Sequence, residues 1–170
     1  MTNPLLEPWD TPFGLPPFDR IEDDHWKPAA EAAIAQARAA IEAIAADPEA
    51  PTFANTIAAL EMADEPMGRV FGAFYAVASA DSSPALQALQ RDFAPMLSAH
   101  TSWVIGNHVL FDRIEVLWQA RNTLDLGDEE ARVLMLTHRR FVRAGARLEG
   151  AQAERMVEIR ARLSVLGTQF

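Results

Sequence analysis

Apolar residues recur along most of this chain at spacings of three and four positions, and no segment alternates apolar and polar residues as a strand would. Residues at these spacings fall on one face of an α-helix, whereas a half-buried strand needs a period of two. The pattern therefore predicts an all-α fold. We expect a multi-helix antiparallel bundle of about five or six helices, some of them kinked by proline.

Proline, glycine and capping residues predict where the helices begin and end. The first helix should span about residues 26–46, with Asp23 or Asp24 as its cap and Pro28 in its first turn. Gly150 either separates two helices or weakens one long helix. The other helices are expected from Thr52 to about Ala80 with a break at Pro66 and Asp64 as the new cap, from Ser83 with a kink at Pro95, around residues 110–118, and from Asp128 onward.

The first 22 residues contain five prolines, and proline favours extended backbone at its own position and at the preceding one. We expect residues 1–22 to form an extended N-terminal arm and residues 23–170 to form the helical domain. Apolar side chains in the arm indicate that it lies along the surface of that domain: Leu5, Leu6, Trp9, Phe13, Leu15 and Phe18.

The charge balance argues against a nucleic-acid partner. The formal net charge is −9, and phosphate binding needs an excess of Lys and Arg. The charge is uneven, because residues 131–170 hold eight Arg and three acidic residues, which leaves a net charge of −14 on residues 1–130. The chain has no cysteine, which fits a reducing compartment, and no apolar stretch long enough to cross a membrane. We therefore expect a cytoplasmic protein without a membrane partner.

Motifs that carry catalysis are absent from the sequence. None of the four histidines, His25, His100, His108 and His138, is followed by Glu, so the chain lacks the zinc motif His-Glu-x-x-His. Serine-nucleophile and phosphate-binding loop motifs are missing too, and Lys27 is the only lysine. We predict no catalytic, cofactor-binding or metal-binding residue in this chain. A small metal protein that uses distant histidines is the weaker alternative.

Arginines recur near the C-terminal end at a helical spacing. Arg139, Arg143 and Arg147 are four residues apart, with Arg140 beside them. They form either a site for an anion or acidic partner, or a solvated helix face with salt bridges to the acidic part of the chain, and we favour the second interpretation. Aromatic residues at helical spacing are expected to be core rather than a cofactor pocket: Phe71, Phe74, Phe93, Phe111, Trp118 and Phe141.

Several segments, taken together and in order, resemble the bacterial oligopeptidase A and peptidyl-dipeptidase group, whose relatives include thimet oligopeptidase and neurolysin. The longest are Leu-Pro-Pro-Phe-Asp-Arg-Ile at 15–21, Pro-Thr-Phe-Ala-Asn-Thr-Ile at 51–57 and Arg-Phe-Val-Arg-Ala-Gly-Ala at 140–146. Shorter landmarks lie at 3–6, 59–61, 94–95, 100, 107, 110–111, 166 and 168–170. One departure is Ala54, where the family usually has Glu.

The resemblance implies a zinc metallopeptidase that cleaves short peptides in a channel between two helical halves. The family's zinc motif lies downstream of the matched region, so the resemblance gives this chain no catalytic or zinc-binding residue. It implies a non-catalytic N-terminal helical domain that walls the substrate channel. Its partners would be the C-terminal catalytic portion and, in the full-length enzyme, short peptides. Zinc is expected in that full-length enzyme and not in this chain, which should be inactive alone.

The last segment, residues 160–170, still has the amphipathic pattern of a helix where the sequence stops. We interpret this as a domain separated from a longer chain, which should expose an apolar surface and favour self-association. The alternative is a stand-alone helical protein-interaction module without peptidase activity.

Overall fold

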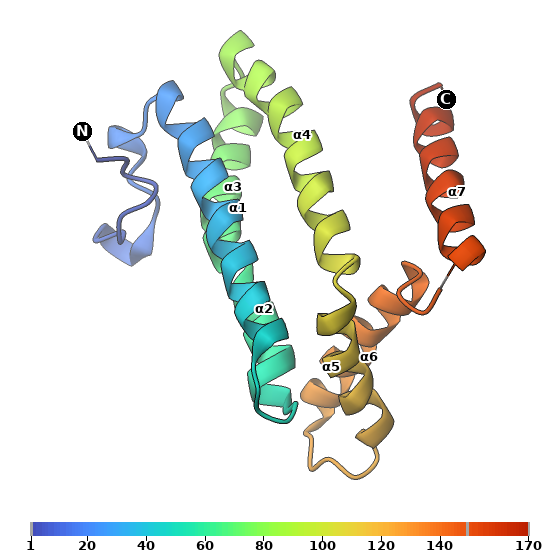
Figure 1. The fold of residues 1–170 in the computed structure, drawn as a ribbon. Helices are drawn as coiled ribbons and strands as arrows, with labels where there is room; N and C mark the ends of the chain where they lie inside the picture. The colour runs from blue at the N-terminus through green and yellow to red at the C-terminus, as the bar shows by residue number, and fades with distance from the viewer. Residues whose placement is uncertain (1, 149, 170) are drawn as a thin grey trace.

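The computed structural model describes residues 2–148 and 150–169, and this part of the chain confirms the all-α prediction, with helices and no strand (Figure 1). None of these helices is both long and apolar enough to cross a membrane. The helices are α1 (Asp23–Ala46), α2 (Ala59–Ala63), α3 (Glu65–Ala80), α4 (Pro84–Ile105), α5 (His108–Ala120), α6 (Asp128–Arg143) and α7 (Gly150–Gln169). Shorter helical turns lie at Pro12–Gly14, Phe18–Arg20 and Phe53–Ala58.

Helix α1 lies at the centre of the packing. It contacts α2, α3, α4 and α5, while α5 and α6 pack together at its C-terminal end (Figure 1). Two hydrophobic clusters result, one along each half of α1. The helices are therefore held by a shared central element rather than by a symmetric bundle core.

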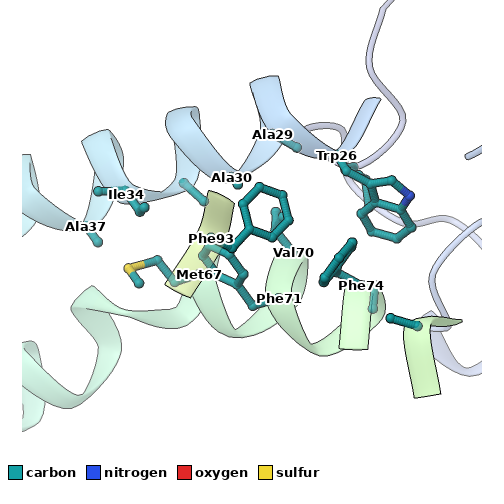
Figure 2. Packing of buried hydrophobic residues seen from close by; sticks show 14 of the residues in the cluster. Trp26, Ala29, Ala30, Ile34, Ala37, Met67, Val70, Phe71, Phe74 and Phe93 are labelled. Carbon is teal, nitrogen blue, oxygen red and sulfur yellow. The ribbon is translucent and has the colours of Figure 1, made fainter. Parts of the chain in front are cut away.

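The first cluster is formed by the first half of α1, the whole of α3 and the first half of α4 (Figure 2). Phe74 is completely buried, with its ring centroid 5.3 Å from that of Trp26 and 4.8 Å from that of Phe93. Both ring pairs meet edge to face, an arrangement that the charge distribution of aromatic rings favours. The sequence prediction that Phe74 and Phe93 are core residues is confirmed.

The second cluster joins the end of α1 to α5, α6 and the π-helical turn at Phe53–Ala58. Its buried apolar side chains are Ile41, Ile44, Ile57, Ala63, Val104, Ile105, Leu110, Phe111, Ile114, Leu117, Leu134 and Phe141. The predicted stripes of α5 and α6 supply half of them. The π-helical turn itself was not predicted, because the sequence read only as one continuing helix.

Local capping explains several helix starts that the sequence predicted. The amide of Asn55 donates to the Thr52 hydroxyl at 3.0 Å, and the amide of Thr52 donates to the Asn55 side-chain oxygen at 2.7 Å. Such reciprocal bonds satisfy amides that have no partner within the helix. The Ser83 hydroxyl accepts from Leu86 at 3.1 Å, and α6 begins at Asp128 as predicted.

The start of α1 differs from the prediction. The helix begins at Asp23, so Asp23 and Asp24 lie in its first turn and Glu22 is the capping position. The free amide of Glu22 donates to Nδ1 of His25 at 3.0 Å. Pro28 lies inside the helix rather than in its first turn. The histidine ring thus accepts from the amide of the capping residue, a bond that the sequence did not predict.

Two other segments also depart from the predictions. The arm is not extended throughout, since it contains helical turns at Pro12–Gly14 and Phe18–Arg20, and only part of it is anchored. Leu5 is buried in the first cluster, while Phe13 is fully exposed. The α6 helix stops at Arg143, because Gly145 adopts a left-handed backbone (φ 92°), so the predicted continuation through Leu148 is wrong. A new helix then begins at Gly150.

Substitution of Phe74 by Ala should remove the ring that the other aromatics of the first cluster surround. We expect the free energy of unfolding to fall by about 3–5 kcal/mol, the usual cost of an aromatic-to-alanine change in a core. Urea unfolding followed by circular dichroism measures it. Met62→Ala is the control, because Met62 is 66% exposed on α2. A Phe74→Ala loss no larger than the Met62→Ala loss would contradict the packing described above.

Candidate functional site

One group of bonded polar side chains lies where α5, α6 and the loop after α6 meet. We call it the Glu115 cluster; it consists of Glu115, His138 and Arg147. The Nε2 atom of His138 lies 2.8 Å from one carboxylate oxygen of Glu115. Arg147 donates to both oxygens of the same carboxylate, at 2.7 and 2.9 Å. The cluster thus links three consecutive segments of the chain.

The environment of Glu115 favours its charged form. Burial alone would raise the pKa of this carboxyl, but hydrogen bonds from Arg147, Gln119 and His138, together with the charge of Arg147, outweigh that effect. The pKa of Glu115 is lowered from 4.5 to about 2. At neutral pH the group is therefore a carboxylate held by its neighbours and not a proton donor.

Aromatic rings enclose the histidine of the Glu115 cluster. The His138 ring is stacked on Trp118, with centroids 4.5 Å apart, and faces Phe111 at 6.1 Å. The guanidinium of Arg121 covers the Trp118 ring at 4.2 Å. The prediction that His138 has one edge on the core is confirmed, and the structure adds the carboxylate at its polar edge.

A second polar group is built around a buried arginine. The guanidinium of Arg113 donates to the backbone carbonyls of Asp47 and Glu49 at 2.7 and 3.1 Å. It also lies 3.4 Å from the Asp47 carboxylate and 3.3 Å from the side-chain oxygen of Asn55. These carbonyls follow the end of α1, where backbone oxygens lack helical partners. Arg113 therefore fixes the end of α1 and the Phe53–Ala58 turn against α5.

A third polar contact joins α4 to the break between α2 and α3. Nε2 of His100, which is buried, lies 3.1 Å from the carboxylate of Asp64. Asp64 occupies the predicted capping position before α3, but its side chain makes no hydrogen bond to the first turn of that helix. The predicted capping bond is therefore wrong. Its carboxylate instead supplies the partner that a buried imidazole requires.

The remaining candidates from the sequence do not gather into one site. His25 caps α1, His108 is exposed at the start of α5, and Lys27 lies 3.6 Å from Asp92. Within residues 2–148 and 150–169, no group of three or more His, Asp or Glu side chains could hold a metal ion. The four histidines are thus spread over the molecule, each in its own surroundings.

The expected arginine stripe is only partly present. Arg139, Arg140 and Arg143 lie exposed on α6, but Arg147 lies beyond the end of the helix, so it does not continue their row. The break at Gly145 turns the chain, and this brings Arg147 to Glu115. The salt bridge to the acidic part of the chain that we predicted for these arginines is present between Arg147 and Glu115.

Sequence reasoning missed two residues that hold the polar groups together, Arg113 and Glu115. One signal for Arg113 was present: it falls among Leu110, Ile114 and Leu117, at an inward position of the α5 stripe. A charged residue at such a position needs a buried partner. The identity of the partner depends on the path of residues 47–55, which periodicity does not give.

In each of these groups, charged or polar side chains face partners of opposite charge or polarity. Carboxylates face arginine or histidine, and the buried guanidinium faces carbonyl oxygens. None of these pairs includes a nucleophilic hydroxyl, and Glu115 has a pKa far too low for a general acid near neutral pH. These contacts position the helices against one another.

Removal of the Glu115 charge should make stability less dependent on acid. The folded pKa lies below the unfolded value of 4.5, so the contribution of this carboxylate is present above pH 4.5 and is lost as the pH falls toward 2. We expect Glu115→Gln to be less stable than the wild type by about 2 kcal/mol at pH 7. Urea unfolding from pH 7 to pH 3 should show this difference shrinking; a constant difference would argue against the cluster.

Replacement of Arg113 by Met should keep the length of the side chain and leave carbonyl oxygens without their donor. We expect a loss of about 3 kcal/mol, as for other buried charged groups whose partner is removed. The matched control is Arg132→Met, since Arg132 is exposed on α6. Equal unfolding midpoints for the two variants would show that the Arg113 contacts do not stabilise the fold.

Known proteins similar to this chain are peptidases, although no protein-family model matches it. It is 42% identical over 168 residues, 99% of the chain, to the dipeptidyl carboxypeptidase of Salmonella typhimurium. The dipeptidyl carboxypeptidase of Escherichia coli is 36% identical over the same length, and oligopeptidase A of Salmonella typhimurium is 32% identical over 170 residues. The chain spans about a quarter of the length of these curated relatives (24–25%). The resemblance to the oligopeptidase A and peptidyl-dipeptidase group is therefore confirmed over the whole chain.

Proposed function

We propose that this chain forms the non-catalytic, N-terminal helical part of a zinc-dependent oligopeptidase that hydrolyses short peptides. The observation that carries the proposal is the similarity over 99–100% of the chain to peptidases about four times as long. A match of this extent makes the chain equivalent to one structural portion of those enzymes. The remaining three-quarters of their length would then supply the catalytic portion.

The residues of this chain do not fit a zinc site. Zinc in peptidases needs three protein ligands that converge on one point, and a zinc-bound water is the nucleophile that the metal supplies. Here His100 and His138 are buried beside Asp64 and Glu115, and the helices hold the four histidines apart. We therefore place zinc and the catalytic base in the portion of the enzyme outside this chain.

The role left for this portion is to wall the channel in which peptides are cleaved. Long helices pack around α1, and charged side chains such as Arg113 and Arg147 form ion pairs within this framework. A rigid helical framework of this kind suits the wall of a channel. A wall of this kind would admit short unfolded peptides and exclude folded proteins. No channel-facing residue is assigned, since the opposite wall belongs to the catalytic portion.

The identities favour one of the two activities named by the relatives. They are 42% and 36% for the dipeptidyl carboxypeptidases, against 32%, 31% and 29% for the three oligopeptidases A. We propose that the complete enzyme acts as a dipeptidyl carboxypeptidase rather than as an oligopeptidase A. The cytoplasmic location predicted from the sequence stays a prediction, which the absence of cysteine supports.

A chimera tests the proposal. This chain would replace the aligned quarter of the Salmonella dipeptidyl carboxypeptidase, and purified chimera would be assayed on a short peptide with a free C-terminus and on the same peptide amidated. We expect zinc-dependent release of C-terminal dipeptides from the free peptide by the chimera. The isolated chain should cleave neither peptide and bind no stoichiometric zinc, because it has no ligand set.

The controls separate the alternatives. Circular dichroism and metal analysis establish whether the chimera is folded and loaded with zinc. A folded, zinc-loaded chimera without activity would contradict the wall role, and a chimera that cannot fold would contradict structural equivalence with the relatives. Peptide cleavage by the pure isolated chain would refute the non-catalytic assignment.

A further inference from the structure

Helix α7 carries a row of exposed apolar side chains. Ile159, Leu163 and Leu166 are 41%, 61% and 45% exposed, and their spacing of four and three places them on one face of the helix. Contiguous apolar side chains at this exposure are characteristic of interaction surfaces. Isolated exposed apolar residues elsewhere, such as Met62 on α2, form no such row.

The described side chains of α7 are not among those that form the two hydrophobic clusters, and in Figure 1 the helix stands apart from α4. The loop before it turns at Gly145, and Arg147 of this loop is bonded to Glu115. The exposed row of α7 therefore follows a loop that is tied to α5.

A cavity lies at the base of α7. It has a volume of about 650 Å³ and is lined by His108, Phe111, Asp112, Ala146 and Arg147, which belong to the start of α5 and the loop after α6. The cavity and the start of α7 therefore adjoin the same loop, and the apolar row begins farther along the helix. A segment packed along the row could place a side chain in the cavity.

The charges around the row indicate what kind of partner fits it. Arg155 and Arg162 border one side of the row on α7, where Arg155 is paired with Glu158 at 2.8 Å, and Arg139 and Arg143 lie exposed on α6. Residues 131–170 carry a net charge of +5. A partner that buries the apolar row must bring its own apolar side chains, and acidic groups beside them would be favoured at this basic border.

We propose that the α7 row and the cavity at its base are the docking surface for the catalytic portion of the peptidase, which contributes an apolar segment with acidic flanks. This inference rests on the proposed function and adds to it the surface through which the two portions meet. The relatives are about four times as long as this chain. In them, the rest of the same polypeptide is available to cover the α7 row. A second copy of the chain fits less well, because a two-fold contact through α7 would bring the same arginines together.

Hydrogen–deuterium exchange of α7 tests the docking surface in the chain alone and in the dipeptidyl carboxypeptidase chimera. In the chain alone α7 should exchange rapidly, since it is outside the cores. In the chimera we expect at least about tenfold slower exchange of its amides, because opening the helix would then require breaking the interface. Leu163→Asp should abolish this slowing, and Arg162→Glu should reduce it.

The matched control is Met62→Asp, which introduces the same charge at an equally exposed apolar side chain outside the surface. It should leave α7 protected in the chimera. An active, folded chimera in which α7 exchanges as fast as in the chain alone would overturn the docking surface while leaving the proposed function intact. Sedimentation of the chain alone adds a second check: a dimer that protects α7 and is dissociated by Leu163→Asp would assign the surface to a second copy instead.

Discussion

The close packing of α1 against its neighbours is the constraint on which the rest of the structure depends. Its inward face is made largely of alanines, and Ala29, Ala30, Ala33 and Ala37 are buried where α3 and α4 cross it. Side chains at a helix contact set how closely two helix axes approach, so small residues here leave room for large rings on the facing helices. The aromatic side chains Phe71, Phe74 and Phe93 on α3 and α4 fill that room (Figure 2). Because the same helix continues into the second cluster through Ile41 and Ile44, both halves of the molecule are aligned on one axis.

The bonded polar side chains hold the helix ends and breaks that the apolar clusters do not fix. Each makes its contact where a helix ends or breaks. Arg113 of α5 binds the end of α1, Asp64 lies between α2 and α3, and Arg147 follows α6. Helix ends carry backbone groups without helical partners, and burying them without a donor or acceptor is costly. Arg113 supplies such partners at the end of α1, whereas Asp64 and Arg147 pair with the side chains of His100 and Glu115. This explains why charged residues occupy buried positions in a chain that shows no catalytic arrangement among its described residues.

How far the sequence predicts such a molecule depends on the range of the interaction. Thr52 and Ser83 act on amides three residues away, so their roles could be predicted from the order of residues alone. The same holds for the buried stripes, which need only the helical period. The end of α6 could not be predicted in this way, since Gly145 competes with a pattern that continues through it. Apart from Gln119, which is four residues from Glu115, the partners of Arg113 and Glu115 lie 23 to 66 residues away in the chain, and periodicity contains no information on contacts at that distance.

Among the described residues, the part of the chain that packs into the two hydrophobic clusters is shorter than the part that is similar to the relatives. Helices α1 to α6, the turn at Phe53–Ala58 and Leu5 of the arm supply the buried side chains of the two clusters, and none of the described α7 side chains is among them. The similarity nevertheless extends over at least 168 of 170 residues and therefore reaches into α7. The docking proposed for α7 would give this helix tertiary contacts beyond that unit, and tertiary packing supplies most of the stability of helices. The bonds between Arg147 and Glu115 connect the two parts, because they tie the loop before α7 to the packed helices.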